Sequence, residues 1–204
     1  MITSTILCIP RGLALCSVQF VPAFMDASPA KCGPKSNGTA TVPLHQGAPL
    51  RILPLGDSIT FGYDELSEKS YRRYLKCLLH SGGNPVTLIG SIQHGDWANN
   101  LNDGFNLHTI DQNLEAGTPE LTRKAEGPNI ILLHAGTVNF VLKLNVTNAV
   151  SRLSNLVDFI TEHNPAALLV VAQLIPNANA TTPSFINHYN SQVPEVVQSR
   201  AQSG

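Results

Sequence analysis

Residues 50–62 read Leu-Arg-Ile-Leu-Pro-Leu-Gly-Asp-Ser-Ile-Thr-Phe-Gly, and this stretch decides the fold. Its first half is short and apolar, which predicts a buried β-strand. Its second half turns polar at Gly56, Asp57 and Ser58. Ligands bind where the strands of open α/β sheets end, and a helix starting there offers free N–H groups to an oxyanion, so Ser58 is expected in a reactive cleft. The alternative is a plain turn with a helix cap, since Asp and Ser both cap helices well.

Strand-like and helix-like stretches alternate after this strand. Short apolar runs predict further strands at 86–90, 129–133 and 167–175, and helical spacing predicts helices within 71–79, 146–163 and 184–199. Residues 91–106 are polar and are interpreted as a loop. Pro194 is expected to kink or divide the last helix. This alternation predicts an α/β domain with a parallel sheet covered on both faces.

Length and charge restrict the class of protein. The chain has 204 residues, enough for one α/β domain with a sizeable core. Its formal net charge of −1 argues against a nucleic-acid-binding surface. No apolar run reaches the ~18 residues of a membrane-spanning helix. Neither nucleic acid nor membrane is therefore expected as a partner.

The four cysteines are Cys8, Cys16, Cys32 and Cys77. Their spacing does not match a metal-binding pattern, and no metal is predicted. Cys77 falls on the apolar side of a predicted helix and is interpreted as a small core residue. A disulfide between Cys32 and Cys77 is the alternative, without support from the spacing.

The N-terminal part is interpreted as a secretory leader followed by a linker. Residues 1–30 are apolar, Arg11 ends a short first region, and Ser28-Pro29-Ala30 provides small residues for cleavage. A disordered extension is the alternative. Residues 31–49 are rich in Gly, Pro, Ser, Thr and Asn, which is typical of a linker. Glycosylation acceptor patterns at Asn37, Asn145 and Asn179 agree with a secreted, extracellular protein.

The stretch at 50–62 resembles the first sequence block of the SGNH (GDSL) hydrolases. The nearest likeness is to the secreted acetylxylan-esterase-like branch, which has I-x-P-L-G-D-S-I-T followed by S-Y-R and L, matched here by Ser70, Tyr71, Arg72 and Leu75. The resemblance extends over residues 51–204. It implies a flavodoxin-like three-layer sandwich with a parallel sheet, of which four strands are visible in the sequence and the fifth is missing.

The resemblance implies a serine esterase that needs no cofactor. Ser58 matches the family's nucleophile, and the expected substrates are small-molecule or polysaccharide acyl esters, in the first place acetyl esters on a carbohydrate such as xylan. A non-catalytic secreted module that binds glycan on the same fold is the alternative. A nucleotide-binding protein is disfavoured because no Gly-rich phosphate loop follows any predicted strand.

Two later blocks of the family are altered. Residues 103–111 read D-G-F-N-L-H-T-I-D, where the family has E-G-[HF]-x-G-x-T-I-D. Gly104 is expected in the pocket, while Leu107 replaces the second Gly, whose N–H serves the oxyanion, and a left-handed backbone is costly for Leu. Where the family has G-T-N-D, Val138 replaces the oxyanion-binding Asn, and Asn139 is the remaining candidate although neighbouring side chains of a strand point in opposite directions.

The family's last block, D-x-x-H, is not found before Gly204, so residues 50–204 are interpreted as a C-terminally truncated domain. No Asp or Glu lies three residues before any histidine; the histidines are His45, His80, His94, His108, His134, His163 and His188. No general base is therefore assigned, and slow ester hydrolysis is expected. His134 is interpreted as a buried histidine bonded to the backbone. Strand 167–175 is expected to remain an exposed sheet edge that invites self-association.

Overall fold

The computed structural model describes residues 6–9, 44–63, 70–175 and 183–201. Seven strands are present in this part of the chain: β1 (Ile6–Ile9), β2 (Leu50–Gly56), β3 (Val86–Leu88), β4 (Ile92–Gln93), β5 (Leu101–Gly104), β6 (Ile130–His134) and β7 (Leu168–Ala172). The helices are η1 (Leu44–Gly47), α1 (Ser58–Phe61), α2 (Ser70–Ser81), α3 (Ile110–Leu121), α4 (Thr137–Val141), η2 (Val146–Asn148), α5 (Ala149–His163) and α6 (Pro183–Ala201).

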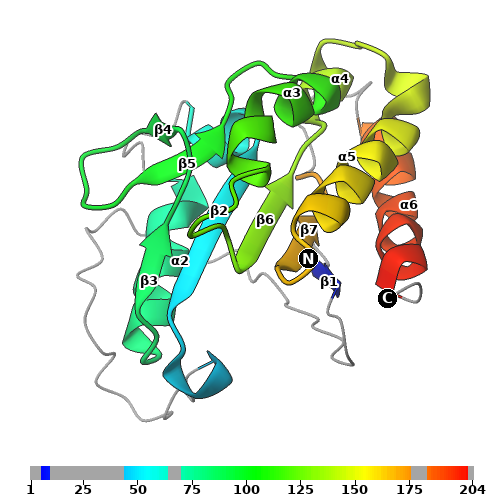
Figure 1. The fold of residues 1–204 in the computed structure, drawn as a ribbon. Coiled ribbons are helices and arrows are strands. Elements are labelled where there is room, and N and C mark those ends of the chain that lie inside the picture. The colour runs from blue at the N-terminus through cyan, green and yellow to red at the C-terminus, as the bar shows by residue number, and fades with distance from the viewer. Residues whose placement is uncertain (1–5, 10–43, 64–69, 176–182, 202–204) are drawn as a thin grey trace, which may run out of the picture.

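The strands form one sheet with β2 at its centre (Figure 1). The order is β1-β7-β6-β2-β5-β4, and β3 also pairs with β2. The pairs of β2 with β3, β5 and β6, and of β6 with β7, are parallel, whereas β1 and β4 pair antiparallel with their neighbours. The predicted α/β fold with a mainly parallel sheet is confirmed.

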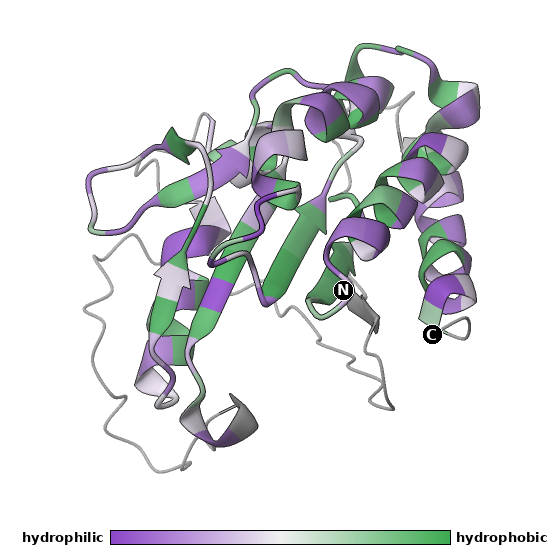
Figure 2. Ribbon diagram, viewed as in Figure 1, coloured by the Kyte–Doolittle hydropathy of each residue, from purple (hydrophilic) through white to green (hydrophobic). Residues whose placement is uncertain are grey.

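The side chains of β2 alternate between two cores, which is why this strand is central. Leu53 and Leu55 join the larger core, which also contains residues of α3, α5 and α6. Leu50 and Ile52 join a smaller core with Leu79 of α2. The sheet therefore lies between two layers of helices. Figure 2 shows hydrophobic residues along most of β6, which lies in the middle of the sheet.

The prediction that residues 91–106 form a loop is wrong, because β4 and β5 lie in this stretch. Strand β5 reads Leu-Asn-Asp-Gly, so no apolar run marks it. Asn102 is nevertheless buried, since its amide donates to the carbonyl oxygens of Ile92 and Asn100 and its Oδ1 accepts from the Gly104 N–H. A polar residue that finds hydrogen-bond partners can occupy a buried strand position.

Helix α3 was not predicted. Its inner face carries Asn113, Gly117 and Glu120 beside Ile110 and Leu121, so the apolar repeat is interrupted. A local signal does exist: the backbone N–H of Thr109 donates to Gln112 Oε1 at 2.9 Å, half of a capping box. Pro194 was expected to kink or divide the last helix; it does not divide it, because α6 runs through this proline.

The prediction of an open sheet edge at β7 is also wrong. Strand β1 pairs with it antiparallel, with Ile6 opposite Ala172 and Ile9 opposite Leu169. The N-terminal segment thus takes the edge position at which a fifth strand was expected. Most of the predicted leader and linker lies outside the described residues, as do the acceptor sites at Asn37 and Asn179. Among the helices described, none is long and apolar enough to span a membrane.

Candidate active site

The turn after β2 holds Ser58 at the first position of α1. Asp57 caps this helix, accepting from the Ile59 N–H at 3.1 Å through Oδ1. Gly62 ends the helix in a left-handed conformation, with φ of 89°, and donates to the Ser58 carbonyl at 2.9 Å. At Gly56, a Cβ atom would lie 2.1 Å from the carbonyl oxygen of His134, so glycine is required for the close approach of β6. The close approach of β6 at Gly56 and the left-handed turn at Gly62 therefore fix the position of Ser58 from both sides.

The fully buried Asp57 connects this turn to the end of β6. Its Oδ2 accepts from the Thr137 N–H at 3.0 Å, and its Oδ1 lies 3.7 Å from His134 Nδ1. Burial alone would raise the pKa of Asp57, but the adjacent His134 imidazole and the Ile59 N–H outweigh burial and hold the pKa below its usual value. Asp57 thus acts as an ionised clamp between the two turns.

Gly104 brings the end of β5 against α1. A Cβ atom here would lie 2.3 Å from the Phe61 backbone nitrogen, and the next residue, Phe105, donates its N–H to the Gly56 carbonyl at 2.8 Å. Leu107 follows with φ of 61°, in the left-handed conformation expected for the glycine that it replaces. The structure therefore places Gly104 and the Leu107 loop beside the Ser58 turn.

Asn139 lies near the turn but its amide is engaged elsewhere. Its Oδ1 accepts from the Ile110 N–H at 3.0 Å, and its Nδ2 donates to the Leu144 carbonyl at 2.9 Å. Asn139 is fully buried, and Val138 is almost so. Asn139 therefore holds the start of α3 to the segment after α4, a structural role that the sequence pattern did not reveal.

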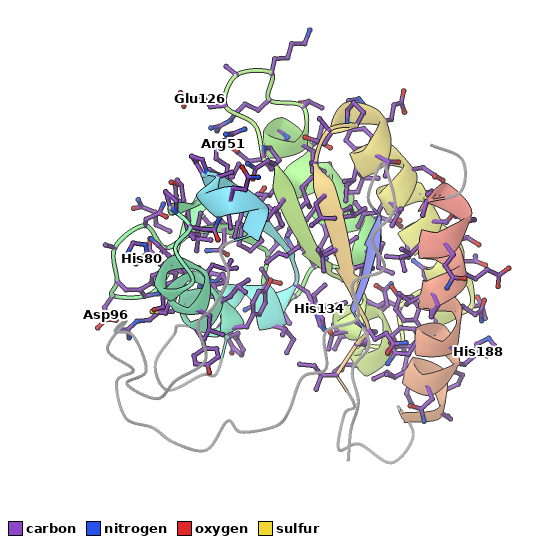
Figure 3. The ribbon with its side chains drawn as sticks, turned by 90° about the horizontal axis from the view of Figure 1, so that it is seen from below. Arg51, His80, Asp96, Glu126, His134 and His188 are labelled. Carbon is purple, nitrogen blue, oxygen red and sulfur yellow. The ribbon has the colours of Figure 1, made fainter. Side chains whose placement is uncertain are left out.

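His134 and His108 differ in their surroundings. His134 is buried, but neither ring nitrogen has a hydrogen-bond partner, so the prediction of a bond to the backbone is wrong. Figure 3 shows it within the fold, whereas His80 and His188 lie at the periphery. His108 is half-buried in the loop after β5, and its ring stacks on Phe105 with centroids 5.2 Å apart.

Arg72 supports the site from α2. Its guanidinium is fully buried and donates to the carbonyl oxygens of Phe61, His94 and Asn100. It thereby ties the end of α1 to the loop before β5. The signal for this role was the Ser-Tyr-Arg motif at 70–72, which the sequence offers only as part of a resemblance.

Asp103, on β5, is a functional candidate that sequence reasoning did not single out. It is fully buried, and its Oδ1 accepts from the N–H and the hydroxyl of Ser91 at 2.6 and 2.8 Å. Burial, with the charge of Glu120 as a further cause, raises the pKa of Asp103 to about 6, against the opposing effect of the Ser91 hydrogen bonds. Within the described ranges, no three His, Cys, Asp or Glu side chains gather in a way that could hold a metal ion.

The geometry agrees with a comparison against known families. Residues 55–203 match the model of the GDSL-like lipase/acylhydrolase family. The chain belongs to this family. The resemblance of its first block to the SGNH (GDSL) hydrolases is thereby confirmed.

Two proteins to which the chain is similar are named as esterases. A multidomain esterase of Ruminococcus flavefaciens is 30% identical over 153 residues, which cover 63% of this chain and 19% of that protein. The chain thus spans about a fifth of this curated relative. A Clostridium thermocellum family 3 carbohydrate esterase is 30% identical, with a TM-score of 0.66, over 76% of this chain and 74% of the other.

A more distant structure shares the fold alone. A family 3 carbohydrate esterase from Talaromyces cellulolyticus is 16% identical with a TM-score of 0.53, over 74% of this chain and 73% of the other. At this identity the similarity extends to the sheet and its helices, and carries no information on substrate.

Proposed function

We propose that this GDSL-family chain is a serine esterase that transfers the acyl group of an ester to Ser58. The observation that carries the proposal is the position of Ser58 at the start of α1, held by the buried Asp57 clamp to Ile59 and Thr137. In such a reaction the Ser58 hydroxyl attacks the ester carbonyl, the alcohol leaves, and water then releases the acid. No cofactor takes part in this chemistry.

For the substrate, we propose acyl esters on a carbohydrate such as xylan, with acetyl as the first acyl group to test. The support is the likeness of residues 51–62 and 70–75 to acetylxylan-esterase-like sequences and the 30% identity to the Clostridium thermocellum carbohydrate esterase. Small-molecule acyl esters would enter the same site.

Turnover is proposed to be slow. A serine hydroxyl needs a base, and loss of the histidine in a serine protease lowers kcat on the order of 10⁶-fold. No histidine of this chain follows an acidic residue at the family's spacing, and His108 stacks on Phe105. If turnover proves fast, His108 is the histidine that we would expect to act as base.

A non-catalytic glycan-binding module is the second candidate. It is favoured by Val138, whose side chain has no donor for an oxyanion, and by Asn139, whose amide is engaged by Ile110 and Leu144. The loss of one oxyanion donor typically costs about 3 kcal/mol of transition-state stabilisation. Such a module would bind acetylated oligosaccharides without cleaving them.

Secretion is part of the proposal. Cys77 is disulfide-bonded, which corrects its interpretation as simply a small core residue, and disulfides persist mainly outside the cytosol. Asn145 and Thr147 of one acceptor pattern are both exposed. Cleavage near Ala30 would remove β1, and only then would the edge of β7 be open to the self-association that the sequence suggested.

The test is formation of an acyl-enzyme. The full chain is incubated with p-nitrophenyl acetate, and intact-protein mass spectrometry is run beside release of p-nitrophenol. We expect acetylation of the wild type and of the matched control Ser81→Ala, an exposed serine at the end of α2, but not of Ser58→Ala. Absence of acetylation, together with binding of acetylated xylo-oligosaccharide by calorimetry, would favour the binding module.

A further inference from the structure

Exposed apolar side chains gather at the edge of the sheet where Ser58 lies. Five of them follow the carboxyl ends of β2, β5 and β6, and we call them the apolar rim: Tyr63, Leu107, Val141, Leu142 and Leu144. Leu107 is the most exposed large apolar residue described, at 63%. Exposed apolar side chains that gather in one region of a protein surface can mark a binding site.

Hydrogen bonds hold two parts of the rim beside the nucleophile. The Tyr63 N–H donates to the Ser58 carbonyl at 3.0 Å. The Phe105 N–H donates to the Gly56 carbonyl at 2.8 Å, and Leu107 follows two residues later. Tyr63 and Leu107 therefore come from segments bonded to the turn that carries the reactive hydroxyl.

The third part of the rim is joined to the second through Asn139. Its amide bridges the Ile110 N–H, three residues after Leu107, and the Leu144 carbonyl. One buried side chain therefore links the loop after β5 to the segment after α4. The segments that carry the rim are thus held together around the Ser58 turn.

The chemistry of the rim fits an alkyl chain better than a sugar. In the stretches 58–63, 105–110 and 137–147, Lys143 is the one residue with a permanent charge. Four of the five rim side chains are aliphatic and offer no hydrogen bond, whereas sugar hydroxyls lose water partners that must be replaced on binding. An alkyl group has no such requirement and gains free energy for each buried methylene.

The backbone of Leu107 agrees with a role in binding. A leucine with φ of 61° is held in a conformation that L side chains avoid, and its exposed side chain gains no core packing in return. Strained residues of this kind concentrate at ligand sites. Fold stability alone does not account for leucine at this position.

We propose that the apolar rim binds the alkyl part of the acyl group, and that acyl chains longer than acetyl are therefore accepted and bind more tightly than acetyl. The inference rests on the proposed function for the place of the ester carbonyl at Ser58, and it refines that function at the acyl end. It requires no turnover, because binding of an uncharged ester analogue reports on the rim directly.

The probe is a series of methyl ketones from 2-butanone to 2-octanone, titrated into the full chain by ligand-observed NMR or calorimetry. We expect affinity to rise about two- to fourfold per added methylene, according to how completely each is buried. Leu107→Asn and Leu144→Ser should flatten this dependence, and Asn tolerates the left-handed backbone. Leu78→Ser, which removes an exposed leucine on α2, should leave the dependence of affinity on chain length unchanged.

An affinity that does not depend on chain length would overturn the inference, as would rim variants that behave like wild type. Concentration-dependent dimerisation abolished by Leu107→Asn would also overturn it, since the rim would then be an interface between copies. An affinity that depends on chain length, without acylation that depends on Ser58, would support alkyl binding by the rim and contradict the proposed esterase activity. The two failures are thus distinguishable.

Discussion

His134 Nδ1 lies 3.7 Å from Asp57 Oδ1, and both residues are buried behind the turn that carries Ser58. Asp57 also accepts from the N–H groups of Ile59 in α1 and Thr137 in α4, the short helices that follow the neighbouring strands β2 and β6. One carboxylate therefore determines the relative position of the Ser58 turn and the segment that carries Val138. Loss of its charge should loosen both.

We expect Asp57→Asn to lower the free energy of unfolding by about 2 kcal/mol at pH 7, because an amide leaves a buried N–H without an acceptor. The lowered pKa of Asp57 means that its contribution is present above the ordinary carboxyl pKa of 3.8 and is lost as pH falls through the folded-state pKa. The difference from wild type should therefore shrink in acid. Urea denaturation from pH 3 to 7 measures it.

The matched control is Asp96→Asn, an exposed aspartate in the loop after β4. Its effect should be small at every pH. A loss for Asp57→Asn no larger than that of Asp96→Asn at pH 7 would disprove the clamp.

Asp103 should contribute a pH dependence of stability opposite to that of Asp57. Its folded-state pKa of about 6 lies above 3.8, so folding favours the protonated form and wild-type stability declines as pH rises from about 4 to 6. At about 1.4 kcal/mol per pKa unit, the decline amounts to roughly 3 kcal/mol at most. Asp103→Asn removes this decline. Thermal unfolding should therefore show the variant becoming more stable relative to wild type as pH rises from about 4 to 6.

Glu120→Gln separates the two causes of this shift. If burial dominates, the decline should persist with its midpoint moved modestly to lower pH once the neighbouring negative charge is gone. A wild-type stability that is flat from pH 4 to 7 would rule out a raised pKa for Asp103.

Leu107→Gly should stabilise the fold by about 1 kcal/mol, because glycine adopts a positive φ without strain. Leu107→Ala retains the Cβ atom and should gain nothing. Urea denaturation of wild type and both variants measures these differences in the free energy of unfolding. Equal stability of the Gly and Ala variants would show that the leucine is unstrained.

Expression through a eukaryotic secretory pathway should add glycan at Asn145, which is exposed between α4 and α5. Thr147→Ala removes the acceptor pattern and leaves Asn145 in place. Mass spectrometry should show the glycan in wild type and its absence from the variant. An unmodified Asn145, with Met1 retained, would argue against secretion.

The disulfide at Cys77 predicts a thiol count. The chain has four cysteines, so at most two thiols should react in the unfolded, unreduced protein. Reduction should lower the free energy of unfolding by about 2–4 kcal/mol. Four reactive thiols before reduction would be the contrary result, and Cys77→Ser is the control that should not respond to reductant through this bond.

Local pattern was sufficient for several elements. The apolar run at 50–55, the helical repeat before Asn164 and the polar break at Gly56 each depend on neighbouring residues, and they gave β2, α5 and the Ser58 turn. Hydrophobic periodicity reports which residues a strand or helix must bury. The alternation of strand-like and helix-like stretches along the chain likewise predicted the α/β class.

The tertiary structure alone decided the roles of polar residues at buried positions. Asn139 was a candidate for the oxyanion, yet the distant Ile110 and the nearby Leu144 engage its amide. Asp103 was interpreted as part of a loop, yet it lies on β5, where Ser91 donates two hydrogen bonds to its Oδ1.

Sequence thus determined the fold class, the central strand and the turn that carries Ser58, because burial of apolar side chains follows a short-range period. It did not determine which polar groups pair, nor that β1 covers β7, because these contacts join residues far apart in the chain. A buried polar group is stable only when such a partner is present, and the folded chain alone brings the partner to it.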